Sequence, residues 1–402
     1  MVVRKRHRGI EGPLGLHREA LASELAAQGY AQRTISFQLQ LVGQLSRWLV
    51  AENLTLAELT AEQVESFERF RRRKGDGRPH ELALTPILGY LRRRGEIPEV
   101  TPTAPAGPVE ELLQRYARYL ADERGVGKST VVHYTDLARL FLRWREQQHP
   151  ELDLANLQAA EVIGFVEREA RNRSVGYVQH LVTALRSLLR FLHLEGRARP
   201  LAEAVPAVAG WRGSLLPRGL TSEQVAQVLN SCDNNTVTGR RDRAILTLLA
   251  RLGLRAGEVA GLELEHFDWP RGEVVILGKG GRQERLPLPA EVGEAVAGYI
   301  LGGRPSVKSG KLFYRVLAPV QALSVSGVRV AVRYALERAG LKPVGAHCFR
   351  HGVATQTLAA GASLPEVGQL LRHRHLSSTA IYAKVDRQRL RELVRPWPGA
   401  VA

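Results

Sequence analysis

One pattern occurs twice in the first half of this 402-residue chain, and it limits the possible folds more than any other feature. The stretches "GYAQRTISFQLQLVGQLSRWLV" and "GVGKSTVVHYTDLARLFLRWRE" begin at Gly29 and Gly125, and each has a threonine and an Arg-Trp pair at the same positions. Such self-similarity indicates a duplicated structural unit. Apolar residues recur at helical spacing in both stretches, almost without the alternation typical of strands, so each copy is predicted to be a bundle of about four or five helices.

Two proline-rich stretches divide the chain into three blocks. "TPTAPAGP" at 101–108 is typical of a stiff, extended linker, and "RARPLAEAVPAVAGWRGSLLPRG" at 197–219 is typical of a longer, partly ordered one, with the second linker placed at 201–215. The predicted organisation is a helical bundle at 1–100, a second helical bundle at 109–200, a third domain at 216–388 and a tail at 389–402. A chain of this length is expected to form more than one core.

The third block combines helices with one strand signal. "LTSEQVAQVLNSC" begins with Thr221 as a predicted N-cap and has Gln224 at the capping-box position, and an apolar helical stretch follows. In "GEVVILGKGGRQERLPLPAEV", β-branched residues flank a glycine-rich turn, which predicts a β-hairpin. The fold class is therefore predicted to be mainly α and multidomain: two helical bundles precede a mostly helical α+β domain with a small antiparallel sheet.

The formal net charge of +17 favours a polyanionic partner, most simply a nucleic acid. Only eight of the 57 basic residues are lysines, and the arginines that make up the rest bind phosphate as planar forks. A GC-rich genome explains part of the arginine excess, but it does not explain why acidic residues fail to balance the basic ones.

Cysteine content and apolar patterning indicate where the protein works. The two cysteines, Cys232 and Cys348, form no disulfide framework, which favours a reducing compartment. The opening "MVVRKRHRGIEG" has no apolar stretch behind it, and the most apolar run, "AILTLLARLGL", is too short to span a bilayer. We therefore expect a cytoplasmic, nucleoid-associated protein without a membrane partner.

A cluster of chemically active residues lies between 347 and 385. Zinc would need cysteine, histidine or carboxylate ligands, and the arginines nearby would repel a cation, so no metal is expected. A packed core would not accommodate an unpaired arginine. Phosphate chemistry fits, since arginines hold phosphate oxygens, histidines move protons and a tyrosine hydroxyl is a nucleophile. The cluster comprises His347, Arg350, His351, His373, His375 and Tyr382.

Two further residues complete an ordered set. Arg255 follows a glycine-containing turn near a predicted helix start, and Lys279 lies at the tip of the predicted hairpin. Each alone is compatible with an ordinary surface residue. The order is informative: an arginine, a hairpin lysine, a His-x-x-Arg motif, a histidine and a tyrosine nine residues later.

This third block resembles the catalytic domain of the tyrosine recombinases, the phage integrase family. The resemblance covers roughly 216–385, and 108–200 resembles the helical, SAM-like core-binding domain of that family. This sequence departs from the family pattern at Gly257, which replaces a serine, and at Arg372, which replaces the glycine of a Leu-Gly-His motif. The block before residue 100 has no match to the β-type arm-binding domain of some integrases. The family's catalytic positions fall on Arg255, Lys279, His347, Arg350, His373 and Tyr382.

The resemblance implies a role for each of these residues. Tyr382 would attack the scissile phosphate and form a 3′-phosphotyrosyl link, while Arg255 and Arg350 hold the non-bridging oxygens. Lys279 would protonate the leaving oxygen. His347 would assist with the tyrosine proton, and His373 would donate to the phosphate. Neither ATP nor another cofactor is implied, and the candidates for further DNA contacts are Lys128, Thr130 and Arg282.

The resemblance also implies partners. The first partner is double-stranded DNA with inverted-repeat core sites. The others are three further protomers, identical or related, that complete a tetramer at synapsis. The tail at 389–402 is expected to dock on a neighbouring protomer of that tetramer. The alternatives are a type IB topoisomerase and a DNA-binding protein that does not cleave. Integration, excision and resolution all stay open.

Three further residues near this set have a minor place in the interpretation. Glu258 either orients Arg255 or is an ordinary helix-surface carboxylate. Cys348 is interpreted as a small apolar filler and not as a thiol nucleophile. His375 does not fit the family spacing, so it is expected to support the site indirectly or to face solvent.

Overall fold

The structure is a computed structural model, and it describes residues 12–73, 83–99, 107–149, 152–208, 219–278 and 282–385. Its described residues divide into two compact units. The first unit falls within 1–56, 67–93 and 215–402, and the second falls within 57–66 and 94–214. Most of the two predicted linkers (101–106 and 209–215) and the whole tail at 389–402 lie outside the described residues. The division into three domains therefore stays a prediction.

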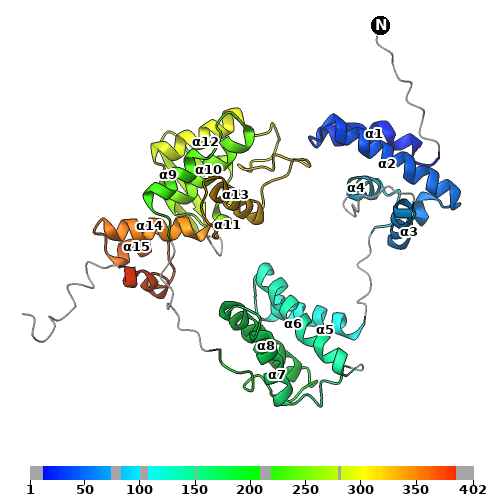
Figure 1. Cartoon of the computed structure of the whole chain (residues 1–402), viewed down its shortest axis with the longest axis horizontal. Helices are drawn as coiled ribbons and strands as arrows, with labels where there is room; N and C mark the ends of the chain where they lie inside the picture. Colours follow the sequence, from blue (N-terminus) through cyan, green and yellow to red (C-terminus); the bar gives the residue numbers. More distant parts are fainter. Residues whose placement is uncertain are drawn as a thin grey trace, which may run out of the picture. The chain divides into compact units, whose positions relative to one another are not determined.

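The first block is helical throughout its described residues. Leu21 and Leu25 of the first helix and Leu41, Leu45 and Leu49 of the second are almost fully buried, at the i, i+4 spacing of an apolar helix face. The elements are η1 (Gly15–His17), α1 (Arg18–Ala27), α2 (Gln32–Ala51), η2 (Leu56–Glu58), α3 (Ala61–Arg73) and α4 (Thr85–Arg93), labelled in part in Figure 1.

The second block repeats this order of helices. Its elements are α5 (Pro108–Arg118), the π-helical turn η3 (Tyr119–Glu123), α6 (Lys128–Gln148), α7 (Ala159–Ala170) and α8 (Val175–Leu194). Ser174 caps α8 by accepting a hydrogen bond from the Tyr177 backbone at 3.3 Å. Buried Arg145 donates to the Asp153 carbonyl at 2.7 and 3.0 Å and pairs with Glu161, so its charge is satisfied inside the bundle.

One aromatic pair occupies corresponding places in the two blocks. The rings of Trp48 and Phe67 lie 5.5 Å apart, and those of Trp144 and Phe165 lie 5.3 Å apart. The second helices of the two blocks, α2 and α6, are similar in length, with 20 and 21 residues. The last helices differ in length, with nine residues in α4 and 20 in α8. The duplication stays a prediction, and the last helix is where the two blocks differ most.

The packed part of the second block extends beyond the predicted boundary at residue 200. Val205 is buried in the core of this bundle, and Leu201, Ala202 and Val208 pack against it. The first half of the predicted, partly ordered linker is therefore packed against the bundle. Its apolar residues attach it there.

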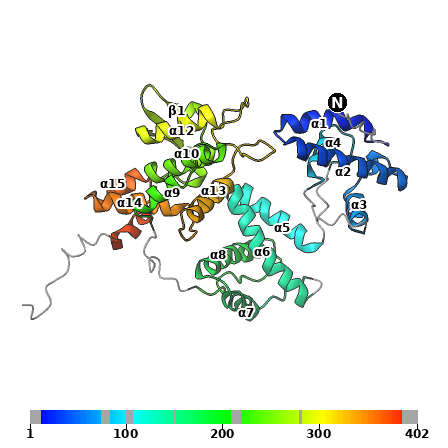
Figure 2. The same cartoon turned by 45° about the horizontal axis from the view of Figure 1, so that its top comes forward.

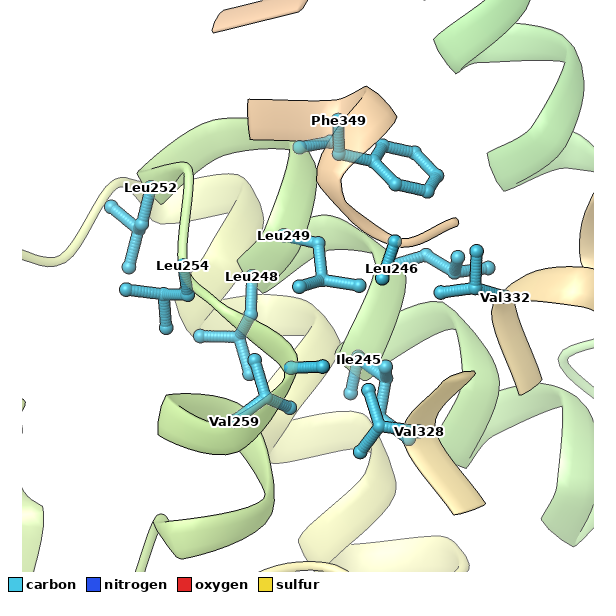
Figure 3. Packing of buried hydrophobic residues seen from close by; sticks show 14 of the residues in the cluster. Ile245, Leu246, Leu248, Leu249, Leu252, Leu254, Val259, Val328, Val332 and Phe349 are labelled. Carbon is cyan, nitrogen blue, oxygen red and sulfur yellow. The ribbon is translucent and has the colours of Figure 1, made fainter. Parts of the chain in front are cut away.

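The third block is built around one buried helix, α10. Its Ile245, Leu246, Leu248 and Leu249 are all completely buried, so apolar neighbours surround the helix on every side (Figure 3). The elements are α9 (Ser222–Asn230), α10 (Val237–Leu252), α11 (Ala256–Gly261), η4 (Leu264–His266), β1 (Phe267–Asp268), β2 (Glu273–Leu277), β3 (Gln283–Pro287), α12 (Ala290–Gly302), α13 (Val325–Arg338), α14 (His347–Ala359), α15 (Leu364–Leu370), η5 (Leu376–Ser378) and η6 (Ala380–Val385).

The predicted hairpin and capping box are both present. β2 and β3 pair antiparallel, with Val275 opposite Arg285, and β1, labelled in Figure 2, adds a short third strand along β2. The Thr221 hydroxyl accepts from the Gln224 backbone at 3.3 Å, and the Gln224 side chain accepts from the Thr221 backbone at 3.1 Å. The predicted fold class, mainly α with a small antiparallel sheet, is confirmed.

Close packing fixes α14, the helix that begins at His347. A Cβ atom on Gly352 would lie 2.7 Å from the Leu220 carbonyl oxygen, which is closer than real contacts allow. Only a glycine at this position therefore lets the segment at Leu220 pack this closely against α14. Leu220 also donates its backbone N–H to the Cys348 carbonyl at 3.3 Å. The segment before α9 therefore sets the position of the helix that carries His347, Arg350 and His351. Among the described residues, no helix is long and apolar enough to cross a membrane.

Candidate active site

Arg350 is buried at the centre of the candidate site. Its side chain donates to the Gly253 carbonyl at 2.6 Å and to the Leu371 carbonyl, which joins the turn before Arg255 to the segment before His373. Burial, and then the charge of Arg255, lower the pKa of Arg350 to about 10, so the guanidinium stays charged at neutral pH. A buried cation held by neutral carbonyls keeps an uncompensated charge available for an anion.

Arg255 is oriented by Glu258. Arg255 stands at the N-cap of α11 and donates to the Glu258 carboxylate from its backbone at 2.9 Å and from its guanidinium at 2.6 Å. Burial acts to raise the pKa of Glu258, but the Arg255 backbone hydrogen bond and the charge of Arg372 outweigh it and lower that pKa. The carboxylate is therefore ionised, and of the two alternatives for Glu258 the structure supports the orienting one.

Arg372 takes the place of the family's glycine and shares the same carboxylate. Its φ of +56° is left-handed, a conformation in which a side chain is strained, and its guanidinium lies 3.0 Å from Glu258 and 3.6 Å from Glu284 of β3. The side chain is 6% exposed. The two ion pairs give a physical reason why an arginine is tolerated where the family pattern has glycine.

Tyr382 is buried and hydrogen-bonded to a histidine. Its hydroxyl lies 2.8 Å from Nδ1 of His351, one turn after His347 on α14. Burial raises the pKa of Tyr382, against the opposing charges of Arg350 and Arg255. The resemblance assigned the tyrosine's proton to His347, yet among the described residues the contact is made by His351. His347 is exposed at the start of α14, with its ring 6.3 Å from that of His351.

His373 also lies beside the tyrosine ring. Its ring is parallel to that of Tyr382 at 6.4 Å, and its Nδ1 lies 2.8 Å from the hydroxyl of Thr379. Burial and the charges of Arg350 and Arg255 lower the pKa of His373 to about 4, so the ring is neutral at pH 7. A neutral ring bound through one nitrogen retains its second nitrogen for a ligand.

The structure thus brings five of the six predicted catalytic residues into one region, while Lys279 lies outside the described residues. Arg282 is exposed at the start of the second hairpin strand, and Lys128 and Thr130 lie in the first turn of α6, Lys128 being exposed. Their predicted DNA contacts stay predictions. His375 is exposed, and burial raises the pKa of the Cys348 thiol to about 11, as expected for a packed and unreactive cysteine.

Sequence reasoning missed two relationships. The contact between His351 and Tyr382 joins residues 31 positions apart, and the shared carboxylate joins Glu258 to Arg372 over 114 positions. The sequence signal for the first was His351, four residues after His347. The signal for the second was Arg372, an arginine where the family pattern has glycine. Neither signal identified its partner, because the partner depends on tertiary packing.

Comparisons with known proteins identify the family of this chain. Residues 218–389 match the phage integrase family, and residues 113–196 match the N-terminal SAM-like domain of phage integrases. A putative integrase/recombinase, y4rA of Sinorhizobium fredii, is 39% identical over 97% of this chain and 96% of its own. The tyrosine recombinase XerC of Anoxybacillus flavithermus is 31% identical over 70% of this chain and 96% of its own. The chain therefore belongs to the phage integrase family and is an enzyme of the tyrosine recombinase class.

Solved structures support the fold independently. The XerH site-specific recombinase, in a post-cleavage complex with a palindromic difH substrate, superimposes with a TM-score of 0.58 at 21% identity, covering 71% of this chain and 96% of XerH. A lambda integrase dimer bound to a COC′ core site gives a TM-score of 0.54 at 16% identity, covering 83% of this chain and 89% of the integrase. At these identities the likeness establishes the fold alone.

Proposed function

We propose that this recombinase cuts and rejoins DNA at specific sites through Tyr382. The observation that carries the proposal is the buried Tyr382 hydroxyl, hydrogen-bonded to His351 and under the positive charge of Arg350 and Arg255. Positive charge beside a phenol favours its ionised form and also the negative charge that develops on a phosphate under attack.

The proposed step transfers a phosphoryl group without loss of bond energy. The Tyr382 oxygen attacks the scissile phosphorus, the bond from phosphorus to the 5′ oxygen breaks, and a 3′-phosphotyrosyl link forms. Arg255 and Arg350 hold the non-bridging oxygens, His373 donates to one of them, and Lys279 supplies the proton that leaves with the 5′-hydroxyl. Attack by a 5′-hydroxyl of a second strand reverses the step, so no ATP and no metal is required.

The proposed partner is double-stranded DNA with inverted-repeat core sites, held at synapsis by four protomers that are identical or of related recombinases. The supporting facts are the net charge of +17 and the DNA complexes of the structural relatives, XerH on a palindromic substrate and lambda integrase as a dimer. The proposed location is the cytoplasm, in association with the nucleoid.

The first helical block is proposed to be a second DNA-contacting bundle. It shares the helix order and the Trp-Phe pair of the SAM-like block, and its α3 ends in Arg71, Arg72 and Arg73. Removing 1–106 is expected to shorten the DNA footprint and to flatten the salt dependence of binding, because fewer counterions are released. An unchanged footprint and slope would indicate a role in protein contacts instead.

A trapping experiment tests the proposed nucleophile. On a nicked substrate that loses its 5′-hydroxyl fragment after cleavage, the wild-type protein should accumulate a covalent adduct, and Tyr382→Phe should form none while still binding DNA. A type IB topoisomerase activity would instead appear as relaxation of supercoils without partner exchange, and a non-cleaving binder would give no adduct in either protein.

A further inference from the structure

Two histidines one turn apart on α14 differ in what they contact. Nδ1 of His351 lies 2.8 Å from the Tyr382 hydroxyl, and the two rings lie 5.7 Å apart at an angle of 59°. His347 is exposed, and no contact joins it to Tyr382 in the described part of the chain. The sequence motif singles out the first histidine, whereas the geometry singles out the second.

The tyrosine needs a proton acceptor in order to react. A phenol has an ordinary pKa near 10, and burial raises the pKa of Tyr382 further. Arg350 and Arg255 oppose this shift without reversing it, so the hydroxyl keeps its proton at neutral pH. Efficient attack on phosphorus therefore requires a base within hydrogen-bonding distance of that hydroxyl.

His351 meets this requirement and its neighbours do not. Burial, and then the charges of His347 and Arg350, lower the pKa of His351, which keeps it neutral and able to accept. His373 uses its Nδ1 for the Thr379 hydroxyl, and among the described residues no hydrogen bond joins its ring to the phenol oxygen of Tyr382. With Tyr382 as donor to Nδ1, the second nitrogen of His351 carries the ring hydrogen.

We propose that His351 takes the proton of Tyr382 as the tyrosine attacks the phosphate and returns it when the tyrosine leaves. During cleavage the bond from hydrogen to the phenol oxygen breaks, a bond from hydrogen to Nδ1 forms, and an imidazolium results. Its charge is balanced by the negative charge that appears on the phosphate. This inference depends on the proposed function, since it assigns a partner to the same nucleophile.

Single-turnover cleavage of the nicked substrate tests the assignment. In His351→Asn the amide oxygen can replace Nδ1 as hydrogen-bond acceptor but cannot take up the proton, whereas His351→Ala removes both functions. We expect both variants to bind DNA normally and to cleave about 10² to 10⁴ times more slowly, the range of a lost general base. The matched control is His375→Asn on the exposed neighbour, with an unchanged rate.

A pH profile separates proton transfer from a structural role. The wild-type rate should fall as the pH drops through the lowered pKa of His351, because the protonated ring cannot accept. His347 and Arg350 from α14, His373 and Tyr382 face the same region, so the informative quantity is the change between variants. The break should vanish in both His351 variants, and added imidazole should accelerate His351→Ala but not the control.

The outcomes separate the two claims. If His351→Asn and His351→Ala cleave within about tenfold of the wild type and keep its pH break, the inference is overturned, whereas the proposed function stands as long as Tyr382→Phe forms no adduct. If Tyr382→Phe still forms the adduct, the proposed function itself fails. If His351→Ala does not fold, His351→Asn decides alone.

Discussion

The two halves of the candidate site are held in different ways. The arginine side, formed by Arg255, Arg350, Arg372 and Glu258, is fixed by charge-assisted bonds and by backbone carbonyls from several segments. The tyrosine side, formed by His351, His373, Thr379 and Tyr382, is joined by hydrogen bonds among neutral groups. The arginine side thus carries permanent positive charge, whereas the tyrosine side carries the protons that can be transferred. This division matches what phosphoryl transfer requires, a prearranged charge and a nucleophile that must lose a proton.

A large effect on cleavage is expected on the arginine side as well. Arg350→Ala should slow cleavage by about two to three orders of magnitude, the usual loss for one donor to a developing oxyanion, while DNA binding is largely retained. Arg350→Lys is the matched variant, because it keeps the charge but lacks the two separate guanidinium nitrogens that donate to the Gly253 and Leu371 carbonyls. Single-turnover rates and gel-shift binding measure both. A rate for Arg350→Ala within about tenfold of the wild type would contradict this role.

The next effect concerns Arg372, which stands where the family pattern has glycine. Arg372→Gly and Arg372→Ala both remove the ion pair with Glu258, but only glycine relieves the left-handed backbone at φ +56°. We expect Arg372→Gly to be the more stable of the two by about 1 kcal/mol, the cost of that conformation for a residue with a Cβ. Denaturant unfolding of both variants gives this difference. Equal stabilities would show that the strain at residue 372 is absent.

The smallest effect is a pH dependence of stability confined to the tyrosine side. The pKa of His373 is lowered from 6.5 to about 4, so the unfolded chain binds this proton more readily than the folded protein does. Stability should therefore fall as the pH drops from 6.5 towards 4. His347 and His351 act in the same direction, whereas the stability that the lowered pKa of Glu258 contributes is present above pH 4.5 and is lost as the pH falls below it.

Melting temperatures of the wild type and His373→Gln between pH 7 and pH 4.5 measure this effect. The variant should lose less stability than the wild type over that window, because it lacks one of the groups that take up a proton on unfolding. Parallel curves for the two proteins would mean that His373 is not kept neutral by the fold.

The same contrast explains how far the sequence alone could lead. Helical periodicity and the glycine-rich turn predicted the helices and the β2–β3 hairpin, because these patterns depend on neighbours in the chain. The spacing from His347 to His351 placed both on one helix for the same reason. The choice of His351 as the partner of Tyr382 and of Glu258 as the partner of Arg372 required the packing of distant segments. Composition likewise does not reveal which apolar side chains of 201–208 pack against the bundle.

The central claim is that Tyr382 becomes covalently joined to DNA, and locating the attachment tests it most directly. The adduct formed on a nicked substrate is digested with a protease and a nuclease, and the peptide that carries the nucleotide is sequenced by mass spectrometry. The account predicts one modified peptide, with a 3′-phosphate on Tyr382 and a free 5′-hydroxyl on the released strand. Attachment at any other residue, or through the 5′ end of the DNA, would contradict it.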